Sequence, residues 1–146
     1  MKKVIFTSLI CASLLTGINV KAQESVISAN LSQMFDEKKE NEYSFSKKYE
    51  NKILKFSAKV DRIDSDCLTS FTNDATTSIP CLKLSPIDSE ITLWGLPSSV
   101  ASAVMKNEDD LLNFKNKQTI ILQCKLEKNP TFFMENFYFK DCIQVK

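Results

Sequence analysis

The stretch that decides the fold is NEYSFSKKYENKILKFSAKVDRI, residues 41–63. From residue 53 onward polar side chains alternate with the apolar residues Leu54, Phe56, Ala58 and Val60. A period of two is typical of a half-buried β-strand. Before it, Phe45 and Tyr49 stand four apart, which is the spacing of one helix face. The stretch therefore predicts a helix that runs through the junction KKYENK into the first strand of a small barrel.

Upstream of this stretch the chain carries a helical pattern from Ser25 to about Tyr49. Apolar residues recur at intervals of three and four, at Val26, Ile27, Leu31, Met34 and Phe35. The run DEKKENE, residues 36–42, is almost entirely charged and predicts a solvated helix face. We therefore expect an N-terminal helix within residues 23–50, followed by a barrel over residues 51–146.

The first 22 residues have the pattern of a secretory signal peptide. Two lysines precede an apolar stretch over residues 4–20, and Ala22 offers a small residue for cleavage. An uncleaved N-terminal anchor is the alternative. No later segment approaches the ~20 apolar residues of a membrane span. The sequence thus predicts a Sec-type signal over residues 1–22 and a single periplasmic or secreted domain over residues 23–146.

Removal of the signal changes the charge of the protein. Residues 1–22 hold three lysines and no acid, so cleavage takes the formal net charge from +1 to about −2. A slightly acidic chain argues against a nucleic-acid or anionic-membrane surface. Arg62 is the only arginine, and bidentate contacts to phosphate or guanine depend on arginine. These features predict that the chain has no nucleic-acid partner.

Downstream of residue 63 the chain alternates between strand and turn patterns. Strands are expected at residues 81–85, 91–96, 118–127 and 131–145. A helix is expected to begin at Pro97, because proline suits the first helical turn, and its buried side would be Val100, Ala103, Val104, Leu111 and Leu112. Five short strands with a helix between the third and fourth predict a mostly-β chain that folds as an OB-fold-like barrel.

Four cysteines lie beyond the signal, at positions 67, 81, 124 and 142. An even number in an exported chain predicts two disulfides, with three possible connectivities. Pairing Cys67 with Cys81 would close the polar hairpin loop between them. Cys124–Cys142 then follows by elimination, although a simple two-strand register does not place these two opposite each other, so a bend is needed. No two cysteines are close enough for a Cys-only metal site.

Several chemistries lack their usual residues. The chain has no histidine, which is the commonest general base and metal ligand. Gly95 is the only glycine beyond the signal, so a glycine-rich phosphate loop is excluded. We therefore expect no catalytic residues, no metal and no cofactor.

Residues 31–145 resemble the tRNA_anti-like OB-fold proteins, an exported or lipid-anchored bacterial family. The resemblance rests on matching positions in two regions: Asn41, Glu42, Lys48, Tyr49, Lys52, Val60 and Ile63, and then Cys124, Cys142 and Ile143. The family usually has glycines where this chain has Ala58 and Asn116 or Lys117. The resemblance implies an OB-fold barrel and does not imply tRNA binding.

Aromatic residues supply the candidate binding surface. These residues are Trp94 on the expected third strand and Phe132, Met134 and Tyr138 on one face of the last strand. Aromatic side chains on the ligand face of an OB barrel stack on ligands or anchor a protein partner. The alternative interpretation is that they fill the core.

A second candidate site consists of carboxylates at a strand end: Asp61, Asp64, Asp66 and Glu90. Such a group could act in metal-dependent hydrolysis of phosphodiesters or glycans, but a solvated turn explains it more simply. The function expected from the sequence is a non-catalytic binding module for a protein or envelope ligand, in an inhibitor, immunity or envelope-stress role. A hydrolase using the carboxylates and an accessory subunit of an envelope or secretion complex are the alternatives.

Overall fold

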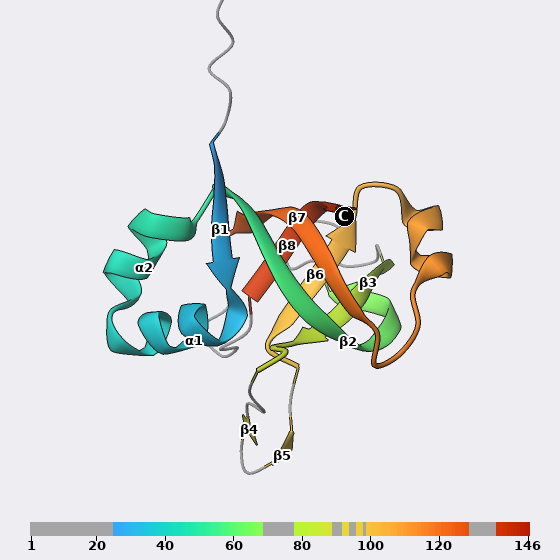
Figure 1. Ribbon diagram of the computed structural model, residues 1–146, viewed down its shortest axis with the longest axis horizontal. Helices are drawn as coiled ribbons and strands as arrows, with labels where there is room; N and C mark the ends of the chain where they lie inside the picture. Colours follow the sequence, from blue (N-terminus) through green and yellow to red (C-terminus); the bar gives the residue numbers. More distant parts are fainter. Residues whose placement is uncertain (1–24, 69–77, 89–91, 94–95, 98, 129–136) are drawn as a thin grey trace, which may run out of the picture.

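The computed structural model describes residues 25–68, 78–88, 92–93, 96–97, 99–128 and 137–146. Five strands form a closed barrel, which confirms the predicted architecture (Figure 1). They are β2 (Ile53–Leu68), β3 (Ser78–Ser85), β6 (Ala101–Met105), β7 (Thr119–Glu127) and β8 (Phe137–Gln144). Their order is β2-β3-β6-β8-β7, and β7 pairs again with β2. Only the β6–β8 pairing within this barrel is parallel.

Strand β2 joins the two sides of the barrel. Its first half, from Ile53 to Lys59, pairs with β7, and the part from Lys59 onward pairs with β3. A register shift at Asp61 marks the change, and bulges of this kind bend a strand and increase its twist. The barrel therefore closes without a glycine at Ala58, whose methyl group is fully buried in the core.

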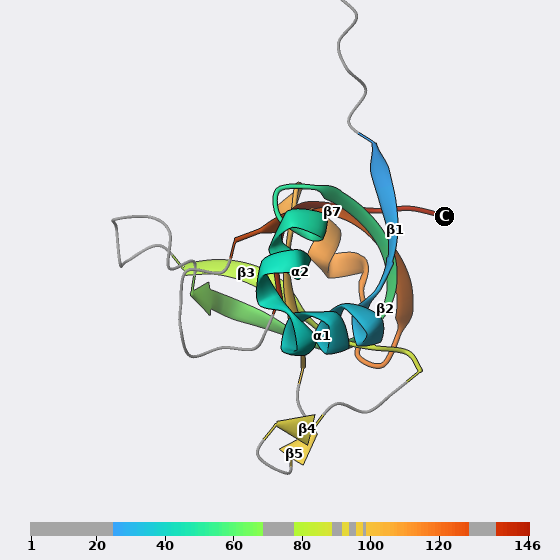
Figure 2. The same ribbon diagram turned by 90° about the vertical axis from the view of Figure 1, so that its left-hand side faces the viewer.

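Two helices cover one end of the barrel (Figure 2). They are α1 (Leu31–Glu40) and α2 (Glu42–Tyr49), which follow one another almost without a break. Asn30 and Asn41 cap them, because each side-chain oxygen accepts a backbone N–H three residues on. Phe45 of α2 stacks on Phe137 of β8 with ring centroids 5.5 Å apart, and this contact joins the helices to the barrel core.

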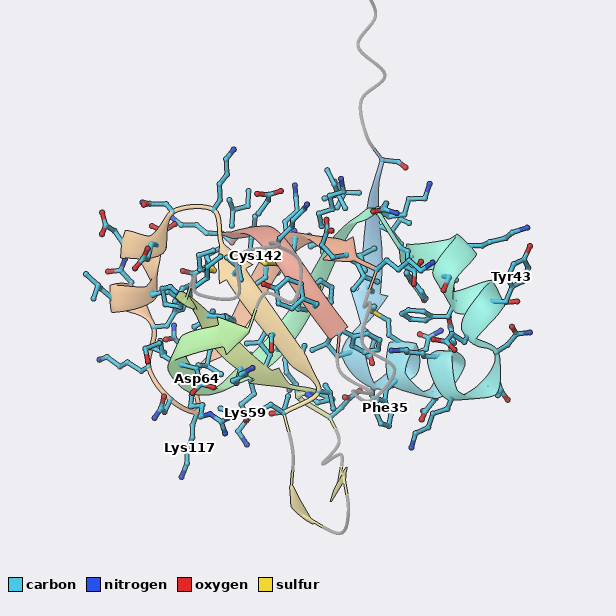
Figure 3. All side chains as sticks on the ribbon, turned by 180° about the vertical axis from the view of Figure 1, so that it is seen from behind. Phe35, Tyr43, Lys59, Asp64, Lys117 and Cys142 are labelled. Atoms are coloured by element: carbon cyan, nitrogen blue, oxygen red, sulfur yellow. A yellow bond between two sulfur atoms is a disulfide. The ribbon has the colours of Figure 1, made fainter. Side chains whose placement is uncertain are left out.

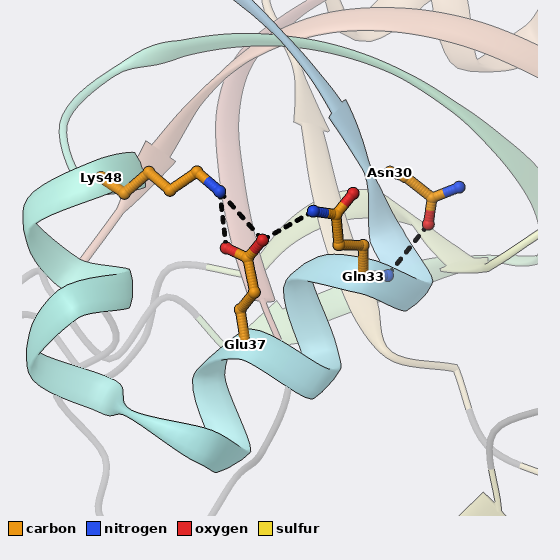
Figure 4. A network of polar contacts seen from close by, with 4 residues as sticks. All are labelled: Asn30, Gln33, Glu37 and Lys48. Carbon is orange, nitrogen blue, oxygen red and sulfur yellow. Dashed lines mark hydrogen bonds and ion pairs between the residues drawn. The ribbon is translucent and has the colours of Figure 1, made fainter.

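A polar network fixes the angle between the two helices (Figure 4). The Nζ of Lys48 donates to both oxygens of Glu37, at 2.9 and 2.8 Å, and thereby connects α2 to α1. Gln33 donates to the same carboxylate at 2.7 Å. The hydrogen bond to Lys48 lowers the pKa of Glu37 and raises the pKa of Lys48. Lys48 of the KKYENK junction thus connects the two helices.

Three element assignments made from the sequence are wrong. Residues 26–30 form strand β1 (Val26–Asn30), parallel to β2, and the helix begins only at Leu31. The helix expected from Pro97 is replaced by strand β6, and the helical turn between the third and fourth barrel strands is the 3-10 helix η1 (Glu108–Asn113). The expected third strand contributes β4 (Thr92–Leu93) and β5 (Leu96–Pro97), a separate two-stranded sheet.

A single cluster of apolar side chains fills the barrel and continues under the helices. Phe56 and Phe139 lie at its centre with ring centroids 4.5 Å apart. The 3-10 helix η1 lies at the end of the barrel that is opposite to α1 and α2. Its residue Leu111 and the adjacent Phe114 belong to the same cluster. Apolar side chains therefore close the core at both ends of the barrel.

The four described cysteines form two disulfides, in the pairs that the hairpin-loop argument favours. Cys67–Cys81 joins β2 to β3, and Cys124–Cys142 joins β7 to β8. The bend needed for the second pair is an extra residue in β8 near Asp141, whose φ of 53° is left-handed. Disulfides are features of proteins outside the cytoplasm. Within the residues described, no helix is both long and apolar enough to cross a membrane.

Candidate ligand-binding face

Alternation along three strands separates the core from an outer face. On β3, Leu82 and Leu84 are fully buried in the core cluster, so Lys83 between them points outward. On β6, Ala101 and Ala103 belong to the core, and Ser102 lies on the outer side. On β8, Phe137 and Phe139 likewise flank Tyr138. Polar side chains therefore occupy the same side of three neighbouring strands.

The register of the sheet aligns these residues in one line across the barrel. Arg62 pairs with Lys83, Lys83 with Ser102, and Ser102 with Tyr138. Tyr138 in turn pairs with Glu127 on β7. We call these five residues the outer row. Residues directly opposite in neighbouring strands are close enough for their side chains to interact, so each member of the row can contact the next.

The centre of the outer row is a hydrogen bond between Lys83 and Ser102. The Nζ of Lys83 donates to the Oγ of Ser102 at 2.8 Å. Ser102 is only 6% exposed, although it lies outside the barrel core. Partial burial lowers the pKa of Lys83, and the nearby charge of Arg62 lowers it further, whereas Asp64 opposes the change. A half-buried ammonium group is thus held on the outer face by a neutral hydroxyl.

The ends of the outer row carry paired charges. Arg62 donates from Nε to the carboxylate of Asp64 at 2.8 Å, and this hydrogen bond raises the pKa of the guanidinium. Glu127 forms an ion pair with Lys140 at 2.6 Å. Burial, together with the charge of Glu127, raises the pKa of the Tyr138 phenol, which stays protonated at neutral pH. Within the described part of the chain no ion pair involves Lys83.

The aromatic residues proposed from the sequence are placed only in part. Trp94, Phe132 and Met134 lie outside the described residues. Tyr138 lies on β8 in the outer row and is half-buried. Sequence reasoning missed Lys83 and Ser102. Lys83 could have been predicted to point outward, because it stands between two leucines in the strand pattern CLKLS. Ser102 could not be assigned to the same face, because its segment was predicted to be a helix.

The carboxylates at the end of β2 have structural partners. Asp61 accepts hydrogen bonds from Ser85 and Ser99, at 2.8 and 2.7 Å, and so ties the bulge in β2 to β3 and to the segment before β6. Asp64 is paired with Arg62. The side chains of Asp66 and Glu90 are outside the part that is described. Among the described residues, no three His, Cys, Asp or Glu side chains are grouped to hold a metal.

A shallow acidic hollow lies beside α1, away from the outer row. It is lined by Ser32, Gln33, Asp36, Glu37, Lys39, Glu40 and Asp88. Two of its carboxylates already have partners, since Glu37 binds Lys48 and Asp88 accepts from Asn30 at 3.1 Å. Figure 3 shows this helical end, marked by Tyr43, far from Lys59, Asp64 and Lys117 at the other end. The hollow therefore belongs to the packing of the helix pair.

Comparison with known proteins identifies a structural relative. No family model matches the chain, and no curated protein matches it. A solved structure, that of a "putative nucleic acid-binding lipoprotein" from Klebsiella pneumoniae subsp. pneumoniae MGH 78578, superposes with a TM-score of 0.59. The similarity covers 83% of this chain and 92% of that chain at 10% sequence identity. At this identity the similarity establishes the fold alone.

This comparison contradicts the prediction that the chain has no nucleic-acid partner. The same barrel occurs in a protein whose name includes nucleic-acid binding. The prediction relied on net charge and on the single arginine, which describe the chain as a whole. The fold places Lys83 between Arg62 and Ser102 on neighbouring strands, and averages over the whole chain do not reveal such a local arrangement of charge.

Proposed function

We propose that the chain is an exported, non-catalytic binding module that engages its ligand on the outer face of the barrel. The observation that carries this proposal is the outer row, to which each of five strands contributes one polar side chain. Burial of a charged amine such as Lys83 costs free energy, because the amine loses part of its hydration. Ionisable side chains with pKa values shifted by burial are concentrated at functional sites. Strands two and three of an OB barrel, here β3 and β6, are also its usual ligand face.

The first candidate ligand is a protein or another component of the cell envelope. The signal pattern over residues 1–22 and the two disulfides support export to the periplasm or beyond. Inhibitor, immunity and envelope-stress roles are consistent with a small exported binding module. We also propose that the chain is a member of the tRNA_anti-like OB-fold group. In this proposal the aromatic residues Trp94, Phe132 and Met134 extend the ligand-binding face.

A pull-down tests this candidate. The affinity-tagged full chain, expressed with its own leader, would be used to capture partners from its own envelope, alongside the variants Lys83→Met and Trp94→Ala. We expect a specific partner that both substitutions weaken and that Lys55→Met, on an exposed part of β2, leaves unchanged. Equal capture by all variants would show that the outer face is the wrong surface. Recovery in one fixed stoichiometric complex would favour the accessory-subunit alternative.

The second candidate ligand is single-stranded nucleic acid, which the structural neighbour favours. Lys83 supplies positive charge, since Arg62 is paired with Asp64, and Tyr138 supplies an aromatic ring in the same row. Cations with stacking aromatics are the usual means of binding single strands. Fluorescence anisotropy with labelled oligonucleotides should then show binding that weakens steeply with salt and in Lys83→Met. Binding that is insensitive to salt would exclude this ligand.

The hydrolase alternative has its own test. Purified protein would be assayed against phosphodiesters and glycans with divalent metals present. Turnover that is lost in Asp64→Asn would replace the binding-module proposal with a catalytic one. We expect no turnover above background, because Asp61 and Asp64 are both engaged in structural contacts.

A further inference from the structure

We propose that the edge of strand β1 that faces away from β2 is a docking site for a second copy of this chain. β1 (Val26–Asn30) comes first in the strand order of the sheet and pairs in parallel with β2. Within the described residues no strand pairs with its other edge, and residues 26–29 make no backbone hydrogen bond outside the ladder with β2. An edge of this kind presents N–H and C=O groups on which another strand can pair.

The helices do not cover β1. In Figure 2, α1 and α2 lie to one side of the strand, and α1 begins where the strand ends. The side chains of Val26, Ser28 and Asn30 are exposed, and Val26 keeps 44% of its surface in contact with solvent. Among the described elements β1 has its main contacts with β2 and α1. The edge is therefore accessible from outside the molecule.

The sequence of β1 does not protect this edge against pairing. Natural edge strands are commonly protected by charged side chains, by proline or by bulges. The residues VISAN include no charge and no proline, and their register with β2 runs without a shift over all five positions. Val26 and Ile27 are β-branched and favour a strand. β1 thus has the composition of a strand that pairs on both of its edges.

The occupant that this edge fits is the same strand of a second copy. An antiparallel register centred on Ser28 places this residue opposite Ser28 of the second copy, and pairs of hydroxyl side chains across strands are favourable. The same register places Ile27 opposite Ala29, and both of these residues pack against the core. It also places exposed Val26 opposite exposed Asn30. Faces of the same kind therefore meet, no like charges oppose one another, and a two-fold axis closes the contact.

The size of the contact predicts a weak dimer. A pairing of five residues from each copy is much smaller than the interfaces of about 1,200–2,000 Å² that stable complexes bury. β1 pairs with residues 53–57 of β2, whereas the outer row crosses β2 at Arg62. The dimer is therefore independent of the proposed function, and it would present two outer rows to one ligand or partner.

Analytical ultracentrifugation of the purified chain, expressed with its own leader, tests the dimer. We expect the average mass to rise from that of a monomer towards that of a dimer as the concentration increases. Ser28→Lys should weaken the dimer about tenfold or more, because two ammonium groups then face each other across the two-fold axis. Ser28→Glu should weaken it for the same reason, and an equimolar mixture of the two variants should dimerise again. The matched control is Ser57→Lys at an exposed position of β2, which should leave the dimer unchanged.

The proposal is wrong if the chain remains a monomer at millimolar concentration, or if Ser28→Lys dimerises as well as the original chain. It is also wrong if the mixture of Ser28→Lys and Ser28→Glu stays monomeric, or if Ser57→Lys weakens the dimer equally. Circular dichroism verifies that each variant is folded. Should the charged variants fail to fold, hydrogen exchange of the unaltered chain decides. Amide exchange in β1 should slow as the concentration rises, and exchange that does not depend on concentration would refute the docking edge.

Discussion

At the residue scale, Glu37 links the two helices through a charge that depends on pH. The hydrogen bond from Lys48 lowers the pKa of Glu37 below the value of about 4.5 expected in the unfolded chain. The contact therefore stabilises the fold fully at pH values above that unfolded pKa, and this stabilisation is lost as the pH falls through the folded pKa. We expect Glu37→Gln to reduce the unfolding free energy slightly at pH 7, because Lys48 is half-exposed and solvent screens the pair, and hardly at pH 3, because protonation of the carboxylate has already weakened the contact. Urea denaturation at the two pH values measures this. Glu40→Gln is the control, and an equal loss for Glu37→Gln at both pH values would contradict the assignment.

Asp61 is the second residue with a testable structural role. It accepts hydrogen bonds from two serines in a partly buried place, so Asp61→Ala leaves both hydroxyls without this acceptor. The expected loss of unfolding free energy is about 1–3 kcal/mol, and Asp61→Asn, which keeps one acceptor oxygen, should lose less. Asp109→Ala on η1 is the exposed control. A loss for Asp61→Ala within ~0.5 kcal/mol of the control, the range of ordinary surface substitutions, would show that the two serines are satisfied in another way.

At the element scale, the sequence predicted strands that are buried on one side and mispredicted segments whose partners are distant in sequence. The alternation in β2 records a buried and an exposed face, and it is correct. In β1 the residues VISAN also fit helical spacing, and pairing with β2 decides their state. In β6 the residues ASAVM favour a helix by propensity, but they are held between β3 and β8.

The candidate site was harder to predict for the same reason. Lys83, Ser102 and Tyr138 are separated by many residues in the chain and become neighbours only through register. Tyr138 could be proposed because an aromatic strand is visible in sequence. The other two could not be combined with it until the position of β6 was known.

The turn before β7 gives a prediction that belongs to an element. Lys117 has a φ of 67°, at one of the positions where the tRNA_anti-like pattern has glycine, and its N–H donates to Val60. Left-handed backbone costs a residue with a Cβ about 1–2 kcal/mol, and glycine adopts it freely but loses more entropy on folding. Lys117→Gly should therefore raise the unfolding free energy by roughly 0.5–1 kcal/mol.

Chemical denaturation of Lys117→Gly and of Asn116→Gly measures this effect. Asn116 is the matched control, because it shares the turn without a positive φ. The control should gain nothing or lose stability. A gain in Asn116→Gly as large as that in Lys117→Gly would show that backbone strain at residue 117 is not the cause.

At the scale of the whole molecule, average properties and local surfaces differ. A net charge of about −2 describes the chain after residue 22, but three of the described acids, Glu37, Asp64 and Glu127, are paired with nearby cations. A binding surface depends on which few side chains the fold brings together. The disulfides likewise act on the whole barrel, because each joins two neighbouring strands.

Loss of both disulfides should remove most of the stability of this barrel. Each closes a loop, of sequence separation 14 for Cys67–Cys81 and 18 for Cys124–Cys142, and such loops contribute about 3 kcal/mol each in the chain-entropy model. Domains of this size have total stabilities of about 5–15 kcal/mol. We expect each paired Cys→Ala variant to lose about 3 kcal/mol, and the fully reduced protein to be close to unfolding at 37 °C. Urea denaturation followed by circular dichroism, with and without a thiol reductant, measures these losses. If the unfolding free energy of the reduced protein lay within about 1 kcal/mol of that of the oxidised protein, the prediction would be wrong. The apolar core alone would then keep the barrel closed, and the disulfides would restrict the unfolded chain less than the loop-entropy model assumes.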